Sequence, residues 1–115
     1  MNSPIDHPCP CCGFETFTDP PGSYEICSVC GWEDDHVQLC HPEMRGGANR
    51  DSLLEAQAKA LKTHPVGNQA AKGFKRDCAW RPLMESDLQM PNAPTSGNQY
   101  FRAACETPVM YYWKR

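Results

Sequence analysis

The stretch that decides the fold is CPCCG at residues 9–13, followed by CSVCG at residues 27–31. Both fit the pattern Cys-x-x-Cys-Gly, and fourteen residues separate the two cysteine pairs. Two thiolates spaced in this way on a tight turn can reach the same ion, and the glycine allows a positive φ that turns backbone amides toward the sulfurs. Four soft ligands in a tetrahedron suit a structural Zn²⁺. The sequence therefore predicts one Zn²⁺ held by Cys9, Cys12, Cys27 and Cys30.

A metal here would replace a core that the first half of the chain, which is poor in aliphatic residues, cannot build by itself. We predict a small α+β fold. It consists of a zinc-ribbon-like β-hairpin with the two cysteine turns, one capped helix packed on it, and an irregular C-terminal extension with short strands. The expected division is residues 1–64 for the ribbon and helix and residues 65–115 for the extension, packed as one compact unit.

Residues 14–17 and 24–26 are predicted to be the two strands of the hairpin, and Pro-Pro-Gly at 20–22 supplies its turn. Val37 and Leu39 suggest a short third strand.

Residues 51–64 have the clearest helix signal, because Ser52-x-x-Glu55 is a capping box. The apolar stripe of this helix is expected to be Leu54, Ala58 and Leu61, with Leu53 beside it. Further along, we expect a weaker helix at 68–76, an extended stretch at 78–84, and short strands at 100–105 and 109–113.

The chain has no apolar run long enough to span a membrane and no secretory signal, so we expect a cytoplasmic protein. Its eight cysteines are then expected to be thiols or metal ligands rather than disulfides. Cys11 is left over by the pairing. A small buried hydrophobe is its plainer role, and a reactive thiol beside the metal is the alternative. The sequence does not decide whether three further cysteines are reactive, metal-bound or simply buried: Cys40, Cys78 and Cys105.

Charge is distributed unevenly along the chain. Residues 1–50 contain two basic and eight acidic residues, a net charge of −6, whereas residues 51–115 have a net charge of +3. A Zn²⁺ on four thiolates would add about −2 to the first half. This balance disfavours nucleic acid as a partner and favours a protein, with a basic protein as one candidate.

The second cysteine turn is followed by Trp32, Glu33, Asp34 and Asp35. Trp32 is expected to cover the zinc site or pack on the hairpin. The three carboxylates could hold a hard cation or face a basic partner, so all four residues are a candidate binding surface. A solvated acidic turn is the plainer interpretation.

Several linked blocks resemble the bacterial cysteine-rich CPCC domain family. They are CPCCG at 9–13, PPGSYEIC at 20–27, VCGWEDD at 29–35, GGAN at 46–49 and SLLEA at 52–56. The resemblance covers about residues 7–62, and beyond it only WRPL at 80–83 is similar. It implies a small stand-alone zinc-binding module with no established enzymatic activity. Some members of the family lie near genes suggestive of toxin–immunity systems.

We therefore expect a zinc-stabilised, non-catalytic bacterial binding protein that acts through a protein partner, in its most concrete version as an immunity or antitoxin protein against a basic toxin. One alternative is a regulatory nucleic-acid-binding zinc ribbon with a basic patch of Lys72, Lys75, Arg76 and Arg81. Another is a thiol redox protein that uses the CPCC stretch and requires thiols free of metal.

Overall fold

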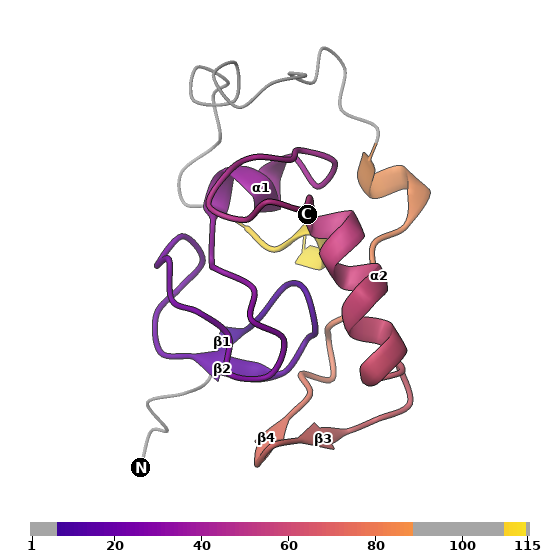
Figure 1. Cartoon of the computed structure of the whole chain (residues 1–115). Helices are drawn as coiled ribbons and strands as arrows, with labels where there is room; N and C mark the ends of the chain where they lie inside the picture. Colours follow the sequence, from indigo (N-terminus) through magenta and orange to yellow (C-terminus); the bar gives the residue numbers. More distant parts are fainter. Residues whose placement is uncertain (1–6, 89–109, 115) are drawn as a thin grey trace.

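The computed structural model describes residues 7–88 and 110–114 (Figure 1). Its strands are short and form two separate antiparallel pairs, and its principal helix is α2. In chain order the elements are β1 (His7–Pro8), β2 (Glu15–Phe17), α1 (His36–Cys40), α2 (Leu53–Thr63), β3 (Ala70–Ala71), β4 (Phe74–Lys75) and the 3₁₀ turns Glu85–Leu88 and Tyr112–Lys114. The predicted small α+β class is confirmed. None of the described helices has the length and apolar character needed to cross a membrane.

Residues 9–13, called here the first knuckle, form a tight turn between β1 and β2. The amide of Gly13 donates to the carbonyl of Cys9 over 2.7 Å, and the amide of Cys9 donates to the carbonyl of Phe14 over 2.9 Å. Gly13 has a φ of +83°, a conformation that glycine adopts without steric cost. The glycine of the cysteine pattern is therefore required by the backbone.

Residues 27–31, the second knuckle, repeat this geometry eighteen positions later. The amide of Gly31 donates to the carbonyl of Cys27 over 2.9 Å, and the amide of Cys27 donates to the carbonyl of Trp32 over 2.8 Å. Gly31 has a φ of +84°. The same five-residue pattern thus folds in the same way twice.

The predicted hairpin between residues 14–17 and 24–26 does not form. β2 pairs with β1 instead, and Ile26 forms an isolated bridge with Glu33 across the second knuckle. In both cases the segment before a knuckle pairs with the segment after the same knuckle. The segment after the first knuckle does not pair with the segment before the second, as the predicted hairpin would require. The zinc-ribbon hairpin of the prediction is thus replaced by two small cysteine turns.

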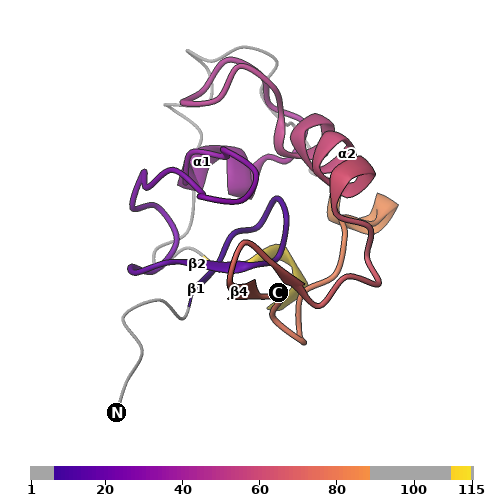
Figure 2. The same ribbon diagram turned by 60° about the horizontal axis from the view of Figure 1, so that its bottom comes forward.

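Residues 36–40 form helix α1 where a third strand was expected. The cause is Asp35, whose carboxylate caps the helix by accepting bonds from the amides of Val37 (2.8 Å) and Gln38 (3.3 Å). Val37 and Leu39, from which the strand was predicted, are both buried in this helix. Figures 1 and 2 place α1 on the same side of β1 and β2 as α2.

Helix α2 begins and ends where its sequence signals indicate, and both hydrogen bonds of the capping box between Ser52 and Glu55 are present. Its buried face is rotated from the expected Leu54, Ala58 and Leu61 stripe. The residues that it buries are Leu53, Gln57 and Ala60. The buried face includes Gln57, a polar residue whose side-chain amide is hydrogen-bonded inside the protein. A prediction based only on hydrophobic residues therefore placed the buried face wrongly.

Residues 68–76 form the β3–β4 hairpin rather than the expected second helix. Lys72 and Gly73 both have positive φ, +51° and +87°, as a two-residue hairpin turn requires. β4 lies beside β2, and an isolated bridge between Phe14 and Arg76 joins the two segments (Figure 2). The C-terminal extension is thereby connected to the first knuckle.

The larger of the two core clusters among the described residues is built around the cysteines and several aromatic residues, and the smaller one consists of Val37 and Met44. Tyr111 and Tyr112 belong to the larger cluster, and Tyr112 lies in a 3₁₀ turn rather than in the expected strand 109–113. The expected strand 100–105 lies outside the described residues. The core includes Cys9, Cys11, Cys12, Phe14, Phe17, Cys27, Trp32, Leu39, Leu53, Tyr111 and Tyr112.

Trp80 covers the first knuckle. A β-carbon added to Gly13 would lie 2.4 Å from the Trp80 ring, closer than real contacts allow, whereas one added to Gly31 would meet nothing within 4 Å. The indole Nε1 of Trp80 donates to the carbonyl of Pro10 over 3.1 Å, which fixes the ring in this position. The two knuckles therefore differ in their cover and not in their backbone.

This difference predicts unequal effects of alanine at the two glycines. Both substitutions force alanine into a left-handed backbone at a cost of about 1–2 kcal/mol. Only Gly13→Ala also pushes into Trp80, and overpacking adds about 1–3 kcal/mol. We expect urea denaturation to give the larger loss of stability for Gly13→Ala. Equal losses would show that Trp80 does not pack on the first knuckle.

Candidate metal centre

The two knuckles bring four cysteine sulfurs into one cluster. The Sγ atoms of Cys9, Cys12, Cys27 and Cys30 all lie within 4.8 Å of one another. Sγ–Sγ distances are 3.7 Å both for Cys9 and Cys30 and for Cys12 and Cys27. A tetrahedron with metal–sulfur bonds of about 2.3 Å has sulfur–sulfur edges of about 3.8 Å. The cluster therefore has the size of a four-thiolate metal site.

These four cysteines are free thiols. Disulfide sulfurs lie about 2.05 Å apart, much closer than the 3.7 Å between the sulfurs here. Three of the four thiols are buried and the fourth, Cys30, is half-buried. The arrangement can hold a metal ion.

Neighbouring groups donate hydrogen bonds to one of the sulfurs. The hydroxyl of Thr16 donates to Sγ of Cys27 over 3.2 Å, and the amide of Val29 approaches the same sulfur at 3.4 Å. Donors aimed at a sulfur stabilise its thiolate form and orient it as a ligand. Thr16 belongs to β2, so the strand that follows the first knuckle also supports a sulfur of the second knuckle.

The close packing of the four thiols shifts their pKa values in different directions. Burial raises the pKa of Cys9 well above its ordinary value, and hydrogen bonding with Cys27 raises the pKa of Cys12. Hydrogen bonds from Cys11 and other thiols lower the pKa of Cys30, and one from Cys12 lowers the pKa of Cys27 to about 7. Repulsion between neighbouring negative charges opposes ionisation of all four thiols at once. A divalent cation bound between them would offset this repulsion and stabilise each thiolate.

The remaining described cysteines differ from one another. Cys11 is buried and lies outside the four-sulfur cluster. Cys78 is an exposed free thiol. Cys40 is disulfide-bonded, so the expectation that all cysteines are thiols or ligands does not hold for it.

An open groove of about 640 Å³ runs beside the cluster. Its lining comes from the second knuckle, from residues 49–51 and from the face of α2 that includes Ala56, Lys59 and Ala60. Among the cysteines that the structure describes, Cys11 and Cys30 line this knuckle–helix groove, and the other three ligands do not. Cys30 is therefore the sulfur of the cluster that solvent reaches.

The candidate surface formed by residues 32–35 is largely inside the protein. Trp32, Asp34 and Asp35 are buried, at 3%, 1% and 5% exposure, and only Glu33 is half-exposed. Trp32 packs in the same core as the cysteines. Three of the four residues therefore have no surface to offer a partner, and the acidic turn is not solvated either.

The two buried carboxylates organise loops. Asp34 accepts bonds from the amides of Gly22 and Ser23 and from the Ser23 hydroxyl. Asp35 caps α1 through one oxygen and accepts from the amide of Ala48 through the other. Burial raises the pKa of Asp34. The acidic run therefore has a structural role. The sequence signal that could have indicated this role is Asp35, an N-cap residue directly before the segment that forms α1.

Arg76 is the most important residue that sequence reasoning placed wrongly. It is only 7% exposed, and its guanidinium lies 4.4 Å from the ring centre of Phe14 and 4.9 Å from that of Trp80. Its donors reach carbonyls at 2.6–3.1 Å, those of Cys12, His64, Pro65 and Asn68. Arg76 thus binds the first knuckle to the end of α2 and to the β3–β4 hairpin.

The expected basic patch does not gather on one free surface. Arg76 is buried, and Arg81 pairs with Asp87 over 2.7 Å. Lys75 is exposed and lies 3.5 Å from Glu15. Lys72 reaches toward the carbonyls of the second knuckle.

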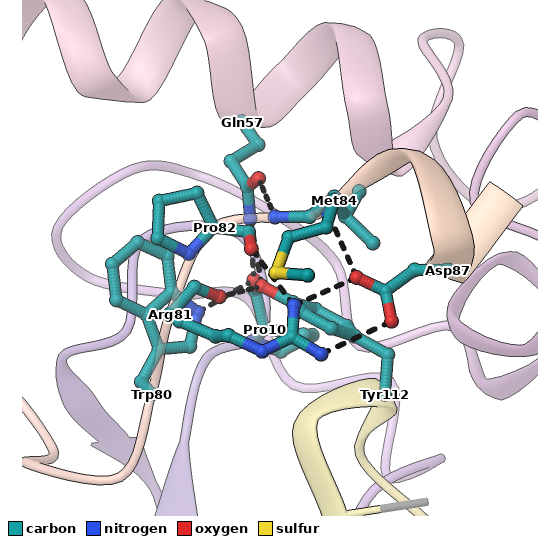
Figure 3. A network of polar contacts seen from close by, with 9 residues as sticks. Pro10, Gln57, Trp80, Arg81, Pro82, Met84, Asp87 and Tyr112 are labelled. Atoms are coloured by element: carbon teal, nitrogen blue, oxygen red, sulfur yellow. Dashed lines mark hydrogen bonds and ion pairs between the residues drawn. The ribbon is translucent and has the colours of Figure 1, made fainter.

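A polar network behind the first knuckle connects distant parts of the chain (Figure 3). Gln57 donates to the carbonyl of Pro10 over 3.2 Å and to the hydroxyl of Tyr112 over 3.0 Å, and its oxygen accepts from the amide of Leu83 over 2.7 Å. The Tyr112 hydroxyl in turn donates to the carbonyl of Arg81. Every polar group of the Gln57 amide is thus used, which accounts for its place on the buried face of α2.

The fold and the site define a class: small cysteine-rich α+β proteins in which a potential metal-binding cluster lies at the centre of a modest core. A family model described as cysteine-rich CPCC matches residues 7–78, and the chain belongs to this family. The resemblance recognised from the sequence is confirmed, and the match extends past α2 to include the β3–β4 hairpin and Arg76. No protein in the curated set matches the chain significantly.

Proposed function

We propose that this chain is a zinc-stabilised binding protein without catalytic activity, in which Cys9, Cys12, Cys27 and Cys30 hold one structural Zn²⁺. The observation that carries this proposal is the four-sulfur cluster, whose 3.7 Å edges match a tetrahedral zinc–thiolate site. Thiolate ligands in a tetrahedron favour zinc over the hard cations that carboxylates select. Bound here, the ion supplies folding free energy.

Four thiolates fill the coordination shell of the ion, which leaves no position for a water molecule or a substrate. A closed site of this kind cannot generate the zinc-bound hydroxide on which zinc hydrolases depend. The protein is then expected to act through its surface.

The surface that best suits a partner lies on the segment before the second knuckle. Tyr24 and Ile26 are 45% and 67% exposed, and Glu33 lies opposite Ile26 in the bridge between their segments. We call these three residues the contact patch. Large apolar side chains at the surface beside a carboxylate suit a protein partner with apolar and basic groups. A basic toxin inhibited by this chain is the concrete version of that partner.

The nucleic-acid alternative has less support, because Arg76 and Arg81 already have partners inside the protein. Phosphate binding needs free cationic side chains on one face. The thiol redox alternative needs knuckle thiols without metal, so the metal content separates it from our proposal.

A single preparation can test both parts of the proposal. Native mass spectrometry should show one zinc per chain, and capture on the immobilised zinc-loaded protein should retain a partner from its source cells. Ile26→Arg should weaken binding of that partner about tenfold or more, because it removes apolar area and adds a repelling charge.

The matched control is Val66→Arg, since Val66 is also exposed, at 53%, but belongs to another segment. It should leave binding unchanged. A metal-free protein with titratable knuckle thiols would overturn the zinc site. Equal binding by the Ile26→Arg variant and the control would overturn the contact patch.

A further inference from the structure

A fifth sulfur lies against the four-sulfur cluster. Cys11 sits between the first two ligands in the sequence and belongs to the core cluster against which Cys30 of the second knuckle packs. Both residues line the knuckle–helix groove. The one ligand open to solvent therefore shares its groove with a non-ligand thiol.

We infer that Cys30 is a site of oxidation by peroxides, that Cys11 is its resolving thiol, and that the disulfide between them releases the metal. This inference rests on the proposed zinc site and adds a regulatory modification to it. The groove gives a small, polar oxidant such as hydrogen peroxide access to Cys30. Cys9, Cys12 and Cys27 are buried and do not line the groove, so they are shielded from it.

The chemistry balances in two steps. In the first, the Cys30 thiolate attacks one peroxide oxygen, the O–O bond breaks, hydroxide leaves, and Cys30 becomes a sulfenic acid. In the second, the Cys11 sulfur attacks the Cys30 sulfur, the S–OH bond breaks, and water leaves with the Cys11 proton. The two cysteines lose two electrons, the peroxide gains them, and the hydroxide of the first step takes a proton from solvent.

The choice of Cys11 as resolving thiol follows from its position. A ligand such as Cys9, 3.7 Å from Cys30, would have to give up its own bond to the metal before it could attack. Cys11 is not a ligand, so it can form the disulfide while the other three sulfurs remain in place. Loss of Cys30 then leaves three ligands and weakens the hold on the ion.

The test is to treat the zinc-loaded protein with hydrogen peroxide and to follow released zinc with a colorimetric chelator. We expect zinc release to accompany a Cys11–Cys30 disulfide. Trypsin cannot locate this bond, because the first basic residue of the chain is Arg45. A glutamate-specific protease cuts after Glu15 and Glu25 and so places Cys11 and Cys30 in different peptides.

Two variants and a control make the test specific. Cys11→Ser and Cys11→Ala should release zinc about tenfold more slowly and should accumulate a Cys30 sulfenic acid that dimedone traps. The use of two variants guards against misfolding by either one, and circular dichroism compares their folds. Cys78→Ser, which changes an exposed thiol outside the cluster, should behave like the unaltered chain.

Zinc bound before oxidation separates this inference from the proposed function. If the untreated protein holds no zinc, the proposed site itself fails. If zinc is held but both Cys11 variants release it as fast as the unaltered chain, or if the disulfide joins two ligands instead, the role of Cys11 is overturned.

Discussion

Cys27→Ser is expected to abolish the cooperative unfolding transition of this protein at room temperature. Apparent zinc-binding free energies at structural sites are about 10–16 kcal/mol, which equals or exceeds the whole stability of a typical domain, about 5–15 kcal/mol. Cys27 is also the sulfur to which Thr16 donates. A serine hydroxyl cannot replace the thiolate, so the proposed ion and the folding free energy that it would supply should be lost together.

Thermal melting followed by far-ultraviolet circular dichroism, together with zinc analysis, checks this expectation. The unaltered chain treated with a strong chelator should resemble the variant. Cys78→Ser is the matched control, because Cys78 is an exposed free thiol. Its stability should stay within about 0.5 kcal/mol of the unaltered chain. A melting curve that neither Cys27→Ser nor chelation changes would refute the structural role of the cluster.

Arg76→Met is expected to lower the free energy of unfolding by about 3–5 kcal/mol, because it removes every donor while keeping most of the apolar length of the side chain. Carbonyls from the first knuckle, the end of α2 and the turn before β3 would then lose their partner. The flat guanidinium between Phe14 and Trp80 would also be lost. Urea denaturation of the zinc-loaded protein measures the change.

The neighbouring residue offers a control for Arg76. Lys75 has a side chain that is 79% exposed and lies 3.5 Å from Glu15, so Lys75→Met should cost no more than about 1 kcal/mol. Arg76→Lys should recover only part of the loss, because an ammonium cannot span carbonyls on different segments as the guanidinium does. Similar losses for the variants of Arg76 and Lys75 would show that the buried hydrogen bonds contribute little.

The features that the sequence predicted correctly are local. The cysteine turns follow from a five-residue pattern with an obligatory glycine, and α2 follows from a capping box and helix formers. The cysteine grouping also follows from the sequence, since the spacing alone pairs Cys9 with Cys12 and leaves Cys11 out. These signals act within a few residues and need no knowledge of the rest of the chain.

The features that were predicted wrongly depend on partners far away in the sequence. Gln57 lies on the buried face of α2 because of Pro10 and Tyr112, and Arg76 is buried because Cys12 offers it a carbonyl. A polar residue that finds such partners cannot be distinguished locally from one that faces solvent. The turn at Lys72 and Gly73 is different, since Gly73 was a cue that favoured a hairpin over a helix.

The order of these residues along the chain has a consequence for biosynthesis. All four cysteines of the candidate metal centre lie within residues 9–30, whereas the Arg76 that braces the first knuckle comes 46 positions after the last of them. At about 5–20 residues per second, a ribosome would present the whole ligand set roughly 2–9 s before Arg76 emerges. Metal capture can thus come first on the nascent chain, and the later segments then wrap around a centre that already exists.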